Sequence, residues 1–220
     1  MKIKTVTAIF KTNKPVKEDA VKLRGFVGNK FDDEILLHHH ITGQQFLFTY
    51  PRVQYKIIKG TPLIVGINER AAVVKNIADD ISSFSLGMNT YHVDQLQLIS
   101  KESRFGYSRA PQHYRFVTPW LSLNKKNYTL YNNSQDWKEK KQILNNILTG
   151  NILSLCKGLN YTVYGRLYVH THLNHQLVTF KGVKHSGFLG RFKVNFHLPE
   201  WLGIGKSTSH GFGTVKYCKK

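Results

Sequence analysis

Residues 1–27 read MKIKTVTAIF KTNKPVKEDA VKLRGFV, and this stretch places a strand directly before a helix. Residues 2–10 alternate between the two faces of an extended chain, and at least one of those faces is wholly apolar. Asn13-Lys14-Pro15 ends the strand. The apolar face of a helix follows at spacings of four, three and four residues: Val16, Ala20, Leu23 and Val27.

The rest of the first half continues this order of elements. We expect a strand at 46–50, a hairpin of 53–58 and 63–67 around Lys59-Gly60-Thr61-Pro62, a helix at 69–81 and a strand at 92–105. The apolar face predicted for that helix carries Ala72, Val73, Ile77 and Ile81. Strand, helix, strands, helix and strand form the split β-α-β unit of ferredoxin-like domains.

The second half repeats the theme in a looser form. Residues 106–112, with Pro111, are interpreted as the boundary, and a strand follows at 113–121. The longest helix is expected at 135–159, with Trp137, Ile143, Leu144, Ile147 and Leu148 inward. A hairpin of 161–172 and 176–183 turns around 173–175, strands follow at 188–198 and 214–218, and only 199–202 remains for a second helix. The predicted fold class is α+β, with two tandem ferredoxin-like (RRM-like) domains at 1–107 and 108–220, the second degenerate.

Net charge is the most informative bulk property. The 32 Lys and Arg residues outnumber the 13 acidic residues, so the formal net charge is +19. A polyanionic partner relieves such self-repulsion, and nucleic acid is the leading class. Residues 106–220 carry 17 basic and 3 acidic residues, whereas 1–105 carry 15 and 10. The second half is therefore the predicted main phosphate-binding surface.

Other bulk features exclude several classes of protein. No apolar window approaches the length of a membrane span, and the first ten residues do not resemble a signal peptide. Cys156 and Cys218 form no C-x-x-C pair, which argues against a disulfide scaffold and a cysteine-ligated zinc site. A cytoplasmic location without membrane association fits these features.

Residues 203–213 read GIGKSTSHGFG and form a glycine-rich element near the C-terminus. Such a segment brings backbone N–H groups close to a phosphate, and Lys206 and three hydroxyls add further donors. A turn that only joins a helix to the last strand remains the alternative. The spacing matches neither a Walker loop nor a dinucleotide-binding fingerprint.

This element resembles the C-terminal signature of the CRISPR-associated repeat-RNA endonucleases, the sixth Cas family of the RAMP superfamily. The signature begins with a triplet of a glycine, a hydrophobic residue and a glycine. Five residues that include a Lys or Arg follow, and a second triplet of the same kind ends it. Residues 22–29, 36–40 and 50–56, which read KLRGFVGN, LLHHH and YPRVQYK, further resemble the b subtype of that family. The resemblance spans essentially the whole chain and implies tandem RAMP folds.

Eleven histidines invite a metal interpretation, which we do not favour. His170 and His172 can share one strand face near His175, but no Asp or Glu lies between 140 and 199. We interpret these three histidines as a surface that contacts RNA or solvent. No metal or other cofactor is predicted.

His38, His39 and His40 support a catalytic interpretation. In an extended segment His38 and His40 point to the same side, where one imidazole can act as base and the other as acid, or one can hold the phosphate. The resemblance implies a metal-independent endoribonuclease in which the 2′-hydroxyl attacks, leaving 2′,3′-cyclic phosphate and 5′-hydroxyl ends. It also implies supporting roles for Lys30 and Tyr50. An exposed histidine run without catalytic duty is the alternative.

The predicted RNA-binding residues fall into two groups. The cations lie in the N-terminal blocks and beside the phenylalanines of the second half: Lys22, Arg24, Arg52, Lys56, Lys181, Lys184, Arg191 and Lys193. The glycine-rich element contributes Gly203, Gly205, Lys206, Ser207, Thr208, Ser209, His210, Gly211 and Gly213. The interleaved Phe180, Phe188, Phe192 and Phe196 could stack on bases, but core packing is favoured for them.

The predicted function is cleavage of precursor CRISPR transcripts within repeats to release guide RNAs. The alternative is a non-catalytic RAMP subunit that holds guide RNA in an interference complex. A tandem RNA-recognition-motif binder is less favoured because the chain lacks that motif's aromatic signature. The expected partner is CRISPR repeat RNA, and the family is compatible with a homodimer and with other CRISPR-associated proteins.

Overall fold

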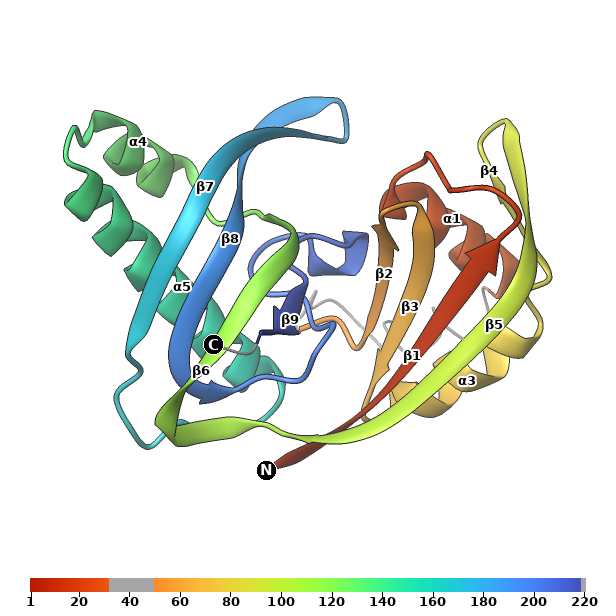
Figure 1. Cartoon of the computed structure of the whole chain (residues 1–220), viewed down its shortest axis with the longest axis horizontal. Helices are drawn as coiled ribbons and strands as arrows, with labels where there is room; N and C mark the ends of the chain where they lie inside the picture. The colour runs from red at the N-terminus through yellow and green to blue at the C-terminus, as the bar shows by residue number, and fades with distance from the viewer. Residues whose placement is uncertain (32–49, 219–220) are drawn as a thin grey trace, which may run out of the picture. The chain divides into compact units, whose positions relative to one another are not determined.

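The computed structural model describes residues 1–31 and 50–218, and the chain divides into two compact units (Figure 1). The N-terminal unit comprises Lys2–Ser103 and Ser209–Gly211. The C-terminal unit comprises Met1, Arg104–Thr208 and Phe212–Lys220. Residues 209–211, in the middle of the glycine-rich element, therefore belong to the N-terminal unit.

The N-terminal unit is a five-stranded sheet with two described helices. Its elements are β1 (Lys2–Thr12), α1 (Ala20–Lys30), β2 (Val53–Ile58), β3 (Thr61–Ile67), α3 (Arg70–Asp79), β4 (Ser83–Leu86) and β5 (Asn89–Arg104). The strand order is β2-β3-β1-β5-β4, so β1 lies in the middle of the sheet. Apart from the short edge strand β4, which the sequence did not predict, this is the predicted split β-α-β arrangement. The strand predicted at 46–50 falls mostly outside the described residues.

Both helices pack on the face of β1 that carries Val6, Ala8 and Phe10. The buried residues of α1 are Ala20, Leu23 and Val27, as the spacing predicts. The predicted face of α3 is partly wrong, because Ala72 is exposed while Ala71, Val74, Ile77 and Ala78 are buried. Hydrophobic periodicity in a short alanine-rich helix defines its buried face only approximately.

The C-terminal unit repeats the plan with a four-stranded sheet. Its elements are β6 (Gly106–Trp120), α4 (Lys125–Asn133), α5 (Trp137–Gly158), β7 (Val169–Phe180), β8 (Val183–His197), the short 3-10 helix η1 (Thr208–His210) and β9 (Val215–Tyr217). The strand order is β7-β8-β6-β9. The strands β7, β8, β6 and β9 thus correspond in order to β2, β3, β1 and β5 of the N-terminal sheet, which has the edge strand β4 in addition. Residues 199–202, the stretch left for a second helix, are not helical, and the three-residue η1 is the short helix after β8. The predicted fold, with its degenerate second domain, is confirmed.

The turn predicted at 173–175 is wrong. Strands β7 and β8 pair without interruption from Val169 to Phe180, and the turn is Lys181-Gly182. Both turn residues have positive φ, 51° and 76°, which is the backbone of a tight two-residue hairpin. Lys59-Gly60 turns the β2–β3 hairpin with nearly the same angles, 50° and 77°. Both hairpins therefore turn on a Lys-Gly dipeptide.

Two further expectations at the start of this unit are corrected. The strand expected at 113–121 begins earlier, because residues 106–112 form the first half of β6, and Pro111 lies where the β6–β8 register shifts between Tyr107 and Gln112. A register shift tolerates a residue without an N–H group. Trp137, expected inward, is 66% exposed because it is the first residue of α5. Leu144 and Leu148 are buried as predicted.

Candidate nucleic-acid interface

Helix α1 holds Arg24 on its exposed side. The carboxylate of Asp19 caps the helix by accepting from the backbone N–H groups of Val21 and Lys22, at 3.0 and 3.1 Å. Because Leu23 is fully buried, the next residue along the helix points away from the core. The Arg24 guanidinium is thereby presented at the surface of the N-terminal unit.

Arg24 meets the glycine-rich element at His210. A guanidinium nitrogen lies 2.8 Å from His210 Nε2, and His210 Nδ1 lies 3.2 Å from Ser209 Oγ. Arginine has only donors, so Nε2 must accept and the imidazole proton is assigned to Nδ1. Arg24 thus joins Ser209 and His210, which are distant from it in sequence, in one hydrogen-bonded group, which we call the Arg24–His210 cluster.

Gly211 seats this segment against the N-terminal unit. Its φ is +88°, and an added Cβ would lie 3.0 Å from Tyr55 O and 3.1 Å from Ala20 Cβ. Glycine is therefore required at this position for two reasons: its positive φ and the close approach of β2 and α1.

The other residues of the glycine-rich element are held by packing and by backbone hydrogen bonds. Gly203 and Gly213 allow close approach to Thr208 and to Ile204 O, and Gly205 lies against Trp120. Thr208 is buried, Ser207 adopts a positive φ of 54°, and Lys206 Nζ donates to Leu123 O at 2.9 Å. These residues shape the turn, while Ser209 and His210 supply the polar groups that reach Arg24.

Lys56, predicted as an RNA contact, is fully buried. Its ammonium donates to Gln54 Oε1 at 3.0 Å, and Gln54 Nε2 donates to Tyr50 Oη at 2.7 Å. Burial lowers the pKa of Lys56 to about 7. Lys56 is therefore connected through Gln54 to Tyr50, one of the predicted catalytic residues, and sequence analysis did not identify Gln54.

The remaining N-terminal cations lie elsewhere in the unit. Lys30 Nζ donates to Asp80 O, 2.7 Å away at the C-cap of α3, and Lys22 Nζ lies beside Gly87. Arg52 Nε is 3.8 Å from a carboxylate oxygen of Glu69. The described contacts thus do not bring Lys22, Lys30 or Arg52 into the Arg24–His210 cluster. His38 and His40 lie outside the described residues.

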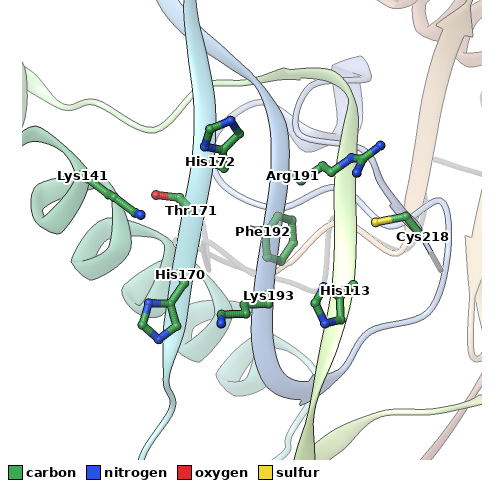
Figure 2. Close-up of a pocket in the computed structure, with 9 residues that line it drawn as sticks. All are labelled: His113, Lys141, His170, Thr171, His172, Arg191, Phe192, Lys193 and Cys218. Atoms are coloured by element: carbon green, nitrogen blue, oxygen red, sulfur yellow. The ribbon is translucent and has the colours of Figure 1, made fainter. Parts of the chain in front are cut away.

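In the C-terminal unit, a surface pocket of about 250 Å³ brings predicted residues together (Figure 2). Arg191 and Lys193 of β8 line it with His170 and His172 of β7 and His113 of β6. His175 does not belong to this group, because it pairs with buried Phe188 and its Nε2 lies 3.0 Å from Ser186 Oγ. No local pattern pointed to His113, since strand pairing alone brings it beside Lys193.

The other predicted residues of this hairpin are separated from the pocket. Side chains alternate between the two faces along a strand, and Lys184 and Lys193 of β8 are separated by an odd number of positions. The side chain of Lys184 therefore points to the face opposite that of Lys193. Lys181 lies at the hairpin turn. Three of the four phenylalanines, Phe188, Phe192 and Phe196, are buried, so the core interpretation is confirmed for them.

Among residues 1–31 and 50–218, no group of three or more His, Cys, Asp or Glu side chains is arranged to hold a metal ion. Within the same residues, no helix has the length and apolar character needed to cross a membrane.

Two protein-family models match the chain almost end to end. The model of the Cas6b N-terminal domain matches residues 1–104, and the model of the Cas6b C-terminal domain matches residues 106–218. The chain belongs to the Cas6b family. This agrees with the resemblance carried by the glycine-rich element and the N-terminal blocks.

Solved structures agree with this membership. This Cas6b chain is 33% identical to a protein whose crystal structure is described as Cas6b, with a TM-score of 0.89 over 99% of this chain and all of the other. It is 32% identical to a crystal structure described as the CRISPR RNA processing endoribonuclease Cas6b, with a TM-score of 0.79 over 99% and 100% of the two chains. A RAMP protein described as binding different RNA substrates shares the fold at 12% identity and a TM-score of 0.56.

A relative of known sequence but uncharacterised function also matches. An uncharacterised protein of Methanocaldococcus jannaschii is 41% identical over 138 residues, which are 62% of this chain and 92% of that protein.

Proposed function

We propose that this protein is an endoribonuclease that cleaves precursor CRISPR transcripts within their repeats and releases guide RNAs. The observation that carries the proposal is the 32% identity, over 99% of the chain, to a solved structure described as a CRISPR RNA processing endoribonuclease. The net charge of +19 supports a polyanionic substrate.

The proposed chemistry uses the nucleophile that RNA itself carries. The 2′-hydroxyl attacks the neighbouring phosphorus, the bond to the 5′-oxygen breaks, and the products carry a 2′,3′-cyclic phosphate and a 5′-hydroxyl. His38 and His40 take the two proton transfers, one removing the 2′-hydroxyl proton and the other protonating the departing 5′-oxygen. No metal ion is needed in this scheme, because neither the nucleophile nor the leaving group depends on one.

The supporting groups are proposed to stabilise charge on the phosphorane and to orient the RNA. Arg24, held by His210, is a permanent cation at the surface of the N-terminal unit and is suited to a phosphate oxygen. Tyr50, fixed through Gln54, is proposed to orient the scissile group, and Lys30 to supply positive charge.

The test is cleavage of repeat RNA in the presence of EDTA. Cleavage should continue, and a single 2′-deoxy substitution upstream of the cut should abolish it. His38→Ala and His40→Ala should each lower the single-turnover rate by roughly 10²-fold or more. His39→Ala is the matched control, because in the extended conformation expected from the sequence the middle residue points to the opposite side from its neighbours.

Several outcomes would contradict the proposal. Activity lost on chelation and restored by a divalent metal would contradict metal independence. Cleavage of the deoxy-substituted RNA would exclude 2′-hydroxyl attack. Tight binding without any cleavage by the wild-type protein would favour the guide-RNA-holding subunit instead.

A further inference from the structure

Strand pairing in the C-terminal unit aligns basic and imidazole side chains in two rows across the sheet. In the first row, Lys193 of β8 lies between His170 of β7 and His113 of β6. In the second row, His172, Arg191, Arg115 and Lys216 come from β7, β8, β6 and β9. Cross-strand partners point to the same face of a sheet, so each row shares one face.

Burial identifies which face this is. The alternate positions, Thr171, Phe192 and Tyr114, are 3%, 3% and 2% exposed. Thr171 donates through its N–H and its hydroxyl to Asn145 Oδ1 of α5, at 2.8 Å each. The two rows therefore lie on the face of the sheet opposite α5, where Arg191, Lys193, His170 and His172 are exposed.

The charged side chains that line the pocket are all basic. Lys141 comes from α5, on the other face of the sheet, points toward the edge strand β7 and adds a further ammonium to the lining (Figure 2). No Asp or Glu lines the pocket, and none occurs between residues 140 and 199. Arg191 has no carboxylate partner among the described ion pairs, so its fork of donors is available to an anion.

The spacing of the rows suits a chain of phosphates better than a single small anion. Residues two apart on a strand lie about 6.8 Å apart, and neighbouring strands lie about 4.8 Å apart. Cations are therefore distributed over two rows and several strands instead of converging on one point. Phe192, the aromatic residue between Arg191 and Lys193, is buried, so it offers no surface for base stacking.

We propose that these two rows form a phosphodiester-binding site that holds the RNA backbone on the C-terminal sheet without reading its sequence. The inference rests on the proposed function for the identity of the polyanion. The site positions RNA and takes no part in the proton transfers, which are assigned to the N-terminal histidines.

The test compares Arg191→Gln/Lys193→Gln with Lys125→Gln/Lys126→Gln, which removes two exposed cations of α4 that do not line the pocket. The ligand is repeat RNA made non-cleavable by a 2′-deoxy group at the cut, and the dissociation constant is measured over a range of salt concentrations. The double variant should bind about tenfold or more weakly, and its salt slope should fall by about 0.7 for each phosphate that is no longer neutralised. Lys125→Gln/Lys126→Gln should match the wild type.

Cleavage provides the second measurement. At saturating protein, the double variant should cut unmodified repeat RNA at the wild-type single-turnover rate, because only its binding is weakened. A dissociation constant and salt slope equal to those of Lys125→Gln/Lys126→Gln would overturn the proposed site.

The two proposals fail in different ways. If the wild-type protein binds RNA but does not cleave it, the proposed function is contradicted. The dissociation constants of the variants then still test the phosphodiester-binding site. Wild-type protein that binds no RNA overturns both. Thermal unfolding of each variant checks that the exposed substitutions leave the fold intact.

Discussion

At the level of single residues, two cations of the N-terminal unit differ in their exposure to solvent. Arg24 is exposed and pairs with His210, whereas Lys56 is fully buried with its ammonium on Gln54 Oε1. No carboxylate accompanies Lys56 among the described ion pairs, and burial is the cause of its lowered pKa. A charged lysine in that position opposes folding, and its ammonium is linked through Gln54 to Tyr50.

Lys56→Met should change how stability depends on pH. The folded pKa of about 7 lies below the ordinary 10.5, so between these values the unfolded chain binds more protons. Wild-type stability should therefore rise with pH across that window, at a slope of up to roughly 1.4 kcal/mol per pH unit. Below pH 7 both states are protonated, and the full penalty is present.

Urea unfolding between pH 6 and 10 measures this effect. Lys56→Met should be more stable than the wild type near pH 6 and should lose the rise. Lys11→Met, at an exposed position on β1, is the control and should keep it. Parallel curves for wild type and Lys56→Met would show that Lys56 does not titrate in this window.

At the level of elements, the glycine-rich stretch is divided between the two units. Ser209–Gly211 belong to the N-terminal unit, and the residues on either side of them belong to the C-terminal unit. Gly211 allows this because its backbone lies against β2 and α1. The signature glycines thus place His210 beside Arg24 by their small size and their backbone freedom.

Gly211→Ala should destabilise the protein and weaken RNA binding. An alanine at φ +88° is strained, and its Cβ also meets Tyr55 O at 3.0 Å. Gly182→Ala is the matched control, because Gly182 has φ +76° but nothing within 4 Å of an added Cβ. Urea unfolding should show a cost of about 1–2 kcal/mol for Gly182→Ala and a larger cost for Gly211→Ala. Equal costs would mean that the contact with β2 contributes nothing.

For the molecule as a whole, positive charge dominates. The excess of basic over acidic residues is largest in residues 106–220, which contain the two cation rows and the pocket of Figure 2. Such a distribution favours association with a polyanion through the release of its counterions.

Binding of repeat RNA should therefore depend steeply on salt. If six phosphates of a single strand are contacted, the dissociation constant should rise roughly 300-fold between 50 and 200 mM salt. A DNA strand of the same sequence is the control and should show a similar slope, because phosphates and not 2′-hydroxyl groups release the counterions. A dissociation constant that hardly changes with salt would contradict a binding surface built from lysine and arginine.

Local patterns predicted most of the fold. Spacings of three and four residues located α1 with its buried Ala20, Leu23 and Val27, and alternation located β1. The polar pair Asn174 and His175 indicated a turn, yet both residues lie within β7. A strand with an exposed face tolerates polar residues, so polarity alone does not mark a turn.

Composition and local pattern were enough to predict the order of most strands and helices and the sign of the charge, because these follow from neighbouring residues and from simple counts. The glycine-rich element and the N-terminal blocks carried the resemblance to the family. Only the packing of distant segments decided that Lys56 is buried while Arg24 is exposed, that His113 joins His170 beside Lys193, and that His210 reaches Arg24. Each of these depends on which remote part of the chain lies against a residue. Hydrophobic spacing along the chain does not contain that information.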